Sequence, residues 1–104
     1  MLNIDDNSFD EEIIEGAEPC LVEFYSSSCL PCRRMEPIME ELSEENSDIK
    51  VAKINIAQGE KTVSEYGVMA SPTFLFFKKG REVGRLVGFM EKSDLERAVD
   101  EVLF

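Results

Sequence analysis

The sequence predicts an α/β fold with a central mixed β-sheet flanked by helices on both faces. Apolar runs of strand length alternate with helical patterns through the first half of the chain, which implies parallel strands joined by right-handed crossovers. Two strand-like runs follow one another in the second half, which indicates a hairpin. The length of 104 residues and the 43% hydrophobic content suit one small domain, so we expect residues 1–104 to form a single unit.

The first half contains two predicted helices and two predicted strands. A short helix follows Asn7-Ser8 and should end at Gly16. Residues 20–25 form an apolar run without clear alternation, which is typical of a central strand covered on both faces. Residues 50–56 alternate between apolar and polar side chains and predict a second strand. Between these strands, a helix is predicted from one apolar stripe at helical spacing: Met35, Ile38, Met39 and Leu42.

The second half contains a short helix, a hairpin and a closing helix. Residues 61–66 predict the short helix, which Gly67 should end. Residues 73–77 predict a buried strand that pairs with residues 82–87 in the hairpin. Ser93-Asp94-Leu95-Glu96 matches a capping box, so the last helix is expected to begin there. Its apolar stripe consists of Leu95, Ala98, Val99, Val102 and Leu103.

Composition and charge exclude several classes of function. Lys and Arg number 11 against 22 Asp and Glu, which gives a net charge of −11. This charge repels phosphate backbones and anionic membrane surfaces, so we expect neither nucleic acid nor membrane as a partner. Histidine is absent, which excludes Cys-His and Ser-His nucleophile–base pairs. The acidic N-terminus lacks the pattern of a secretory signal, so a cytoplasmic location is expected. No feature demands a dimer, and we expect a monomer.

Cys29 and Cys32 are the residues that indicate chemistry. Cys29 comes directly after a predicted strand and loop, and directly before a predicted helix. The first-turn amides of a helix lack intrahelical partners and favour an anion, so we expect them to stabilise the thiolate of Cys29. Cys32 should be more deeply buried. The implied reaction is thiol–disulfide exchange, in which Cys29 attacks a substrate disulfide and Cys32 then attacks Cys29 to release the reduced substrate.

Glu23 is the candidate base for Cys32. It interrupts the apolar run of residues 20–25, and burial raises the pKa of a carboxyl towards the range of a general base. Lys53, in the neighbouring predicted strand, would modulate Glu23 electrostatically. Two alternatives stay open: Glu23 as a solvent-facing residue at a strand edge, and Lys53 as a plain surface lysine.

A Cys-x-x-Cys pair can also be half of a zinc site. Zinc needs about four ligands. The chain offers three cysteines and no histidine, so we expect no metal and no cofactor. The third cysteine, Cys20, is interpreted as a small buried residue at a strand start, with a regulatory thiol as the alternative.

The sequence resembles the thioredoxin family from Asp5 to Leu103. Several segments match the family pattern in order and spacing: Leu21-Val22-Glu23-Phe24-Tyr25, Cys29-Leu30-Pro31-Cys32, Pro37, Val51-Ala52-Lys53-Ile54-Asn55-Ile56, Tyr66-Gly67-Val68, Ser71-Pro72-Thr73-Phe74 and Val87-Gly88-Phe89. The resemblance implies a thioredoxin fold and a redox-active disulfide between Cys29 and Cys32. Cys29 would be the nucleophile and Cys32 the resolving thiol.

The resemblance also implies how substrates bind and which proteins take part. Pro72 would be cis and face the cysteine pair, and the backbone of Ser71 would pair with an extended substrate chain. Gly88 would line the substrate groove, and Lys53 would be the family's buried lysine. Protein disulfides would be the substrates, and a flavoprotein of the thioredoxin-reductase type would be the electron donor. The implied role is that of an electron carrier in cell redox homeostasis.

Four positions depart from the family pattern. Ser28 stands where the family has tryptophan, and Leu30 where it has glycine. Glu23 replaces the family's buried aspartate, and Ser71 replaces a larger apolar residue. Ser28 removes a large flat contact from the docking surface, whereas Leu30 adds an apolar side chain beside the nucleophile. Three alternatives stay open: a carrier dedicated to one partner enzyme with an unusual reductase, a redox-inactive binding module on the same fold, and an oxidant or isomerase.

Overall fold

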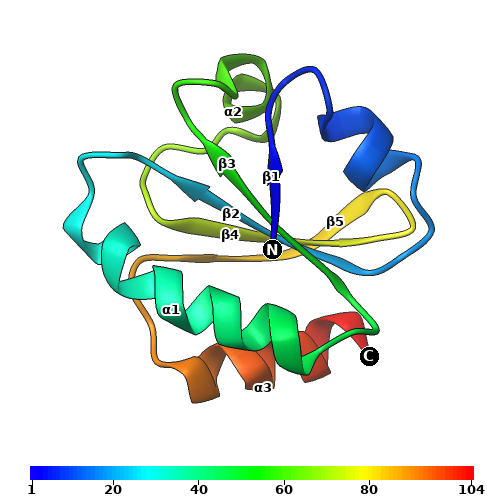
Figure 1. The fold of residues 1–104 in the computed structure, drawn as a ribbon. Coiled ribbons are helices and arrows are strands. Elements are labelled where there is room, and N and C mark those ends of the chain that lie inside the picture. Colours follow the sequence, from blue (N-terminus) through cyan, green and yellow to red (C-terminus); the bar gives the residue numbers. More distant parts are fainter.

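The computed structural model describes residues 1–104 and shows a five-stranded sheet between helices (Figure 1). The elements in chain order are β1 (Leu2–Ile4), the short helix η1 (Asp10–Ile14), β2 (Cys20–Tyr25), α1 (Leu30–Glu45), β3 (Lys50–Asn55), α2 (Glu60–Tyr66), β4 (Thr73–Lys78), β5 (Arg81–Val87) and α3 (Lys92–Leu103). None of the helices has the length and apolar character that crossing a membrane requires.

The sheet is mixed, as predicted. Its strand order is β1-β3-β2-β4-β5. β1 and β2 run parallel to β3, whereas β4 runs antiparallel to both β2 and β5. In the register of β2 and β3, Cys20 lies opposite Lys50 and Glu23 lies opposite Lys53. The central position of β2 explains why apolar side chains occupy both of its faces, because both faces are covered.

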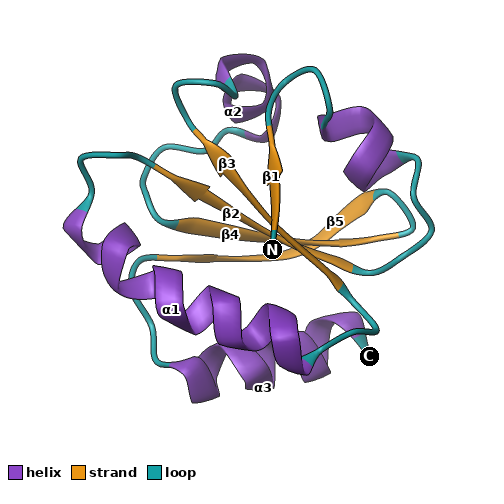
Figure 2. Ribbon diagram, in the orientation of Figure 1, coloured by secondary structure: helices purple, strands orange, loops and turns teal.

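Helices cover both faces of the sheet (Figure 2). α1 and α3 lie on one face, and η1 and α2 lie on the other. Side chains alternate along β2, so Leu21 packs with α1 and α3, while Cys20, Val22 and Phe24 pack in the core under η1 and α2. Glu23 is two residues after Leu21, so its side chain points to the same face of the sheet. Its side chain therefore lies on the α1 face of the sheet, near the end of β2 from which the chain enters α1.

The structure corrects the predicted elements at three points. β1 was not predicted, because three residues at the edge of the sheet are too few for an alternating pattern to be recognised. η1 ends at Ile14, before Gly16. α3 begins at Lys92 rather than at the predicted capping box. The carbonyl of Glu91 accepts the first helical bonds from the amides of Asp94 and Leu95, at 3.1 and 3.2 Å. Ser93 therefore already lies inside the helix and does not cap it.

Candidate active site

Cys29 and Cys32 form a disulfide at the start of α1, with 5.2 Å between their Cα atoms. Cys29 is the N-cap residue of this helix. The backbone N–H of Cys32 donates to the Cys29 sulfur at 3.1 Å. Pro31 occupies the first turn, where a missing amide removes no helical bond. The helix therefore directs a backbone donor at Cys29, an arrangement that stabilises negative charge on that sulfur after reduction.

The two cysteines differ in their exposure to solvent. Cys32 is 6% exposed, whereas Cys29 is only partly buried. Leu30, between them, is 68% exposed. Ser28 is also exposed, and its amide donates to the hydroxyl of Ser26 in the loop that follows β2. A molecule in solution can thus approach Cys29, while Cys32 is shielded by the protein.

The loop before β4 brings Ser71 and Pro72 to Cys29, and Gly88, which follows β5, bonds to that loop. The peptide bond between Ser71 and Pro72 is cis, as the family resemblance implied. The carbonyl oxygen of Ser71 lies 3.5 Å from the Cys29 sulfur. The amide of Gly88 donates to the carbonyl of Pro72 at 2.8 Å. Gly88 has a φ of 95°, a conformation that favours glycine, and a Cβ there would meet no atom within 4 Å. Open space therefore lies beside this backbone.

Apolar side chains surround this loop. Met69 is 96% exposed and Phe89 is 41% exposed. Five apolar side chains and Ser71 line a hollow of about 210 Å³: Ile56, Val63, Val68, Met69, Ala70 and Ser71. Sequence reasoning missed Met69, because it lies in an irregular segment where periodicity gives no signal.

Glu23 lies in a second hollow, of about 150 Å³, which Cys32 also lines. The Glu23 side chain is buried, and its Oε2 has no hydrogen-bond partner. Burial raises the pKa of Glu23 to about 7, Lys53 acts against this shift, and Glu36 adds to it. The prediction that Glu23 is buried is confirmed, and the alternative of a solvent-facing strand edge is wrong. A carboxyl with this pKa can take up and release protons near neutral pH.

Lys53 lines the same hollow, but its ammonium pairs with the carboxylate of Glu36 and not with that of Glu23. Lys53 Nζ lies 3.2 Å from Glu36 Oε1 and 5.4 Å from the centroid of the Tyr25 ring. The Lys53 side chain is 18% exposed, so it is not a plain surface lysine. Sequence reasoning missed Glu36. A signal was available, because Glu36 follows Cys32 by four residues and so lies on the same face of α1.

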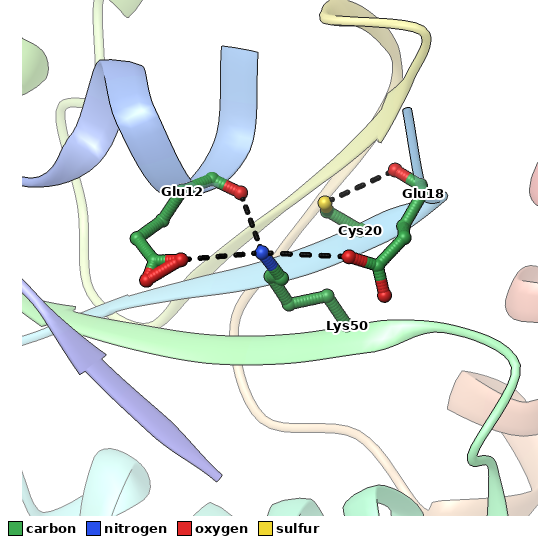
Figure 3. Close-up of polar contacts among 4 residues, drawn as sticks. All are labelled: Glu12, Glu18, Cys20 and Lys50. Atoms are coloured by element: carbon green, nitrogen blue, oxygen red, sulfur yellow. Dashed lines mark hydrogen bonds and ion pairs between the residues drawn. The ribbon is translucent and has the colours of Figure 1, made fainter. Parts of the chain in front are cut away.

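Cys20 lies at the opposite end of β2 and is fully buried. Its thiol donates to the carbonyl of Glu18 at 3.3 Å, beside the ion pairs of Lys50 (Figure 3). Burial raises the pKa of Cys20 to about 11. The interpretation of Cys20 as a small buried residue is confirmed. Nowhere does the structure gather three or more Cys, Asp or Glu side chains in a group that could hold a metal ion.

Comparisons with known proteins agree with this geometry. The chain is 40% identical over 94 residues to a thioredoxin of Alicyclobacillus acidocaldarius subsp. acidocaldarius, covering 89% of this chain and 90% of that protein. It is 39% identical over 94 residues to a thioredoxin of Rickettsia prowazekii (strain Madrid E), with the same coverage. It is 35% identical over 101 residues to thioredoxin 1 of Synechococcus elongatus, covering 96% and 94%.

The family model for thioredoxin matches residues 1–101, which include the whole sheet and both cysteines of the disulfide. The mixed five-stranded sheet with helices on both faces is the thioredoxin fold. The close pair of Cys29 and Cys32 at the start of α1 supplies the chemistry. The chain therefore belongs to the thioredoxin family of thiol–disulfide oxidoreductases.

Proposed function

We propose that the protein reduces protein disulfides by dithiol–disulfide exchange through Cys29 and Cys32, and that it serves as an electron carrier in cell redox homeostasis. The observation that carries this proposal is the disulfide at the N-terminus of α1, with one sulfur accessible and the other buried. This asymmetry supports a fixed order of attack. The accessible sulfur meets the substrate, and the buried sulfur completes the reaction.

In the first step, the thiolate of Cys29 attacks one sulfur of the substrate disulfide. A bond forms between Cys29 and that sulfur, the substrate disulfide breaks, and its second sulfur leaves as a thiolate and takes up a proton. The backbone N–H of Cys32, 3.1 Å from the Cys29 sulfur, supports the negative charge of the attacking group.

In the second step, Cys32 loses its proton and attacks Cys29. The Cys29–Cys32 disulfide forms, the mixed disulfide breaks, and the first substrate sulfur leaves as a thiolate. Glu23 is the proposed base, supported by its pKa of about 7 and by the hollow that it shares with Cys32. The hollow of about 150 Å³ has room for a water molecule that would pass the proton from the thiol to the carboxylate.

The loop around Pro72 is the proposed substrate-binding surface. An extended substrate segment would pair with the backbone of Ser71, next to Cys29, and would pass over the open space at Gly88. Ser28 and the exposed Leu30 would contact the partner on the other side of the nucleophile. Lys53, which also lines the hollow, would act on Glu23 electrostatically.

The electron donor in this proposal is a flavoprotein of the thioredoxin-reductase type, acting on a monomer in the cytoplasm. A donor of unusual specificity is the second candidate, and the protein would then be a carrier for one partner enzyme. Leu30 favours this second candidate, because an exposed leucine beside the nucleophile changes the surface that a reductase must contact. The net charge of −11 would select a partner with a basic docking face.

The test is reduction of a model protein disulfide with dithiothreitol as the electron source. The wild-type protein should accelerate the reduction, Cys29→Ser should reduce the rate to background, and Cys20→Ser should retain the wild-type rate. Turnover by Cys29→Ser would contradict the assignment of the nucleophile. A redox-inactive binding module would give no acceleration in any of the three proteins.

A further inference from the structure

Two carboxylates and two cations line the hollow beside Cys32. The buried carboxylate does not pair with the lysine that lies opposite it in the sheet. Glu23 and Lys53 lie opposite each other in the register of β2 and β3. Glu23 Oε2 nevertheless has no partner, while Lys53 Nζ lies 3.2 Å from Oε1 of Glu36 on α1. The second cation, Arg33, donates to the carbonyl of Ser27 at 3.5 Å. Neither cation is therefore hydrogen-bonded to the buried carboxyl.

The position of Glu36 explains why Lys53 pairs with it. The Glu36 side chain is 59% exposed, whereas Glu23 is 3% exposed. An ion pair at the exposed mouth of a hollow loses less hydration than one in its interior. A lysine side chain can extend its charged end towards water while its methylenes stay buried. The ring of Tyr25, with its centroid 5.4 Å from Lys53 Nζ, adds a second attraction at the same place.

We propose that Glu36 is a positioning residue for the resolving step, holding the ammonium of Lys53 at the mouth of the hollow and so leaving Glu23 free to accept the proton of Cys32. This inference rests on the proposed role of Glu23 as the base. Glu36 itself touches neither the substrate nor the sulfurs in this account. It acts through Lys53 and through its own negative charge.

Both effects of Glu36 act in one direction. When the carboxylate of Glu36 is removed, Lys53 is free to turn towards the unpaired Oε2 of Glu23. The negative charge of Glu36, which repels a negative charge on Glu23, is also lost. Each change favours the ionised form of Glu23, because a nearby cation stabilises a carboxylate and a nearby anion destabilises it. The remaining groups that face Glu23 are Cys32 and Arg33 from α1 and Tyr25 from β2, while Phe74 lies opposite Glu23 on β4.

The test compares Glu36→Gln with Glu40→Gln in the reduced protein. Glu40 is one turn further along α1, is exposed, and lies outside the hollow, so both variants remove one negative charge from the same helix. The pKa of Glu23 is measured by carboxyl carbon NMR as a function of pH. We expect Glu36→Gln to lower this pKa by about one unit or less, and Glu40→Gln to leave it unchanged.

The kinetic readout is the pH profile of the resolving step in single turnover. With Glu36→Gln, the rise in rate with pH should shift to lower pH, and the rate above this rise should fall about two- to fivefold, because a weaker base removes the proton. Formation of the mixed disulfide at Cys29 should be unchanged. A pKa of Glu23 that is the same in Glu36→Gln and Glu40→Gln would overturn the inference.

A Lys53→Met background separates action through the lysine from direct action. We expect Glu36→Gln to change the pKa of Glu23 much less in that background. An undiminished shift would overturn the positioning role. Failure of the proposed function gives a different result, because a normal resolving rate and pH profile in Glu23→Gln would remove Glu23 as the base. The NMR titration of Glu23 would still report on Glu36.

Discussion

β2 and β3 place a buried titratable group opposite a lysine at two points, and the outcomes differ. At one end, Cys20 lies opposite Lys50, and at the other, Glu23 lies opposite Lys53. Lys50 Nζ is held at 2.9 and 3.3 Å by the carbonyl and carboxylate of Glu12 and at 3.6 Å by the carboxylate of Glu18 (Figure 3). No hollow lies beside Cys20. The groups around Cys20 are packed against one another and have a structural role.

The Glu23 end has the opposite character. Lys53 has one ion-pair partner, Glu36, and Glu23 keeps an unpaired oxygen beside a hollow that reaches Cys32. The register therefore does not by itself make a reactive site. Proton exchange by the buried acid also depends on which groups pair with the lysine and on whether space lies beside the acid. Glu23 is the third residue after Cys20 on β2, so the two side chains lie on opposite faces of the sheet, and Cys20 packs in the core under η1 and α2.

The comparison predicts that the Glu23 end lowers stability at high pH. Burial raises the pKa of Glu23 from 4.5 to about 7 in the folded protein. The folded state therefore holds this proton more tightly, and stability falls as pH rises between these two values. Glu23→Gln should increase the free energy of unfolding by about 2–3 kcal/mol near pH 8, with a much smaller difference near pH 4. Urea unfolding at both pH values measures this, and an equal difference at both would contradict the account.

Substitutions at the two ends of β2 should also differ in their effect on the rate of the resolving step. Glu23→Gln removes the proposed base, so it should slow the attack of Cys32 on the mixed disulfide about 10- to 100-fold near neutral pH. Formation of the mixed disulfide should keep its rate. Single-turnover kinetics with a model protein disulfide resolve the two steps, and Cys20→Ala is the matched control at the other end of β2. Equal slowing of both steps would remove Glu23 as the base.

The contacts of Lys50 should affect stability and not chemistry. Lys50→Met removes the three contacts to Glu12 and Glu18, and should lower the free energy of unfolding by about 1 kcal/mol. The rate of disulfide reduction should stay unchanged. Denaturant unfolding and the dithiothreitol assay check the two parts. A slower reduction by Lys50→Met would break the distinction between the two ends.

The smallest expected effect concerns the reactivity of Cys20. Its thiol is fully buried and burial raises its pKa to about 11, so it should not react with a thiol reagent in the folded, oxidised protein near neutral pH. Unfolding the oxidised protein should expose one reactive thiol. Mass spectrometry of the alkylated protein counts the modified sites. Rapid labelling of Cys20 in the folded state would show that this end is open and would favour a regulatory thiol.

Local patterns predicted most of the sheet and the central chemistry. The apolar run of β2 and the Cys-x-x-Cys spacing placed Glu23, Cys29 and Cys32 in the correct elements, because each signal is contained within a few residues. No local pattern predicts β1, because this three-residue edge strand acquires its structure from pairing with β3. The side chain of Ser93 suits an N-cap, yet the carbonyl of Glu91 starts the helix two residues earlier.

The polar pairing inside the site was harder to predict. The partner of Lys53 depends on how α1 lies over the end of β2, and no local pattern records that packing. The spacing of four residues puts Glu36 on the same face of α1 as Cys32, but it does not indicate that Lys53 lies beside that face. The distinction of Glu36 comes from the tertiary structure, which places it at the mouth of the hollow that contains Glu23.

Trapping the mixed disulfide identifies the cysteine that attacks the substrate. Cys32→Ser, incubated in reduced form with a disulfide-containing protein, should accumulate a covalent adduct through Cys29. Cys29→Ser under the same conditions should form almost none through Cys32, because Cys32 is only 6% exposed. Peptide mapping by mass spectrometry identifies the bond. An adduct carried mainly by Cys32, or none in either variant, would contradict the account.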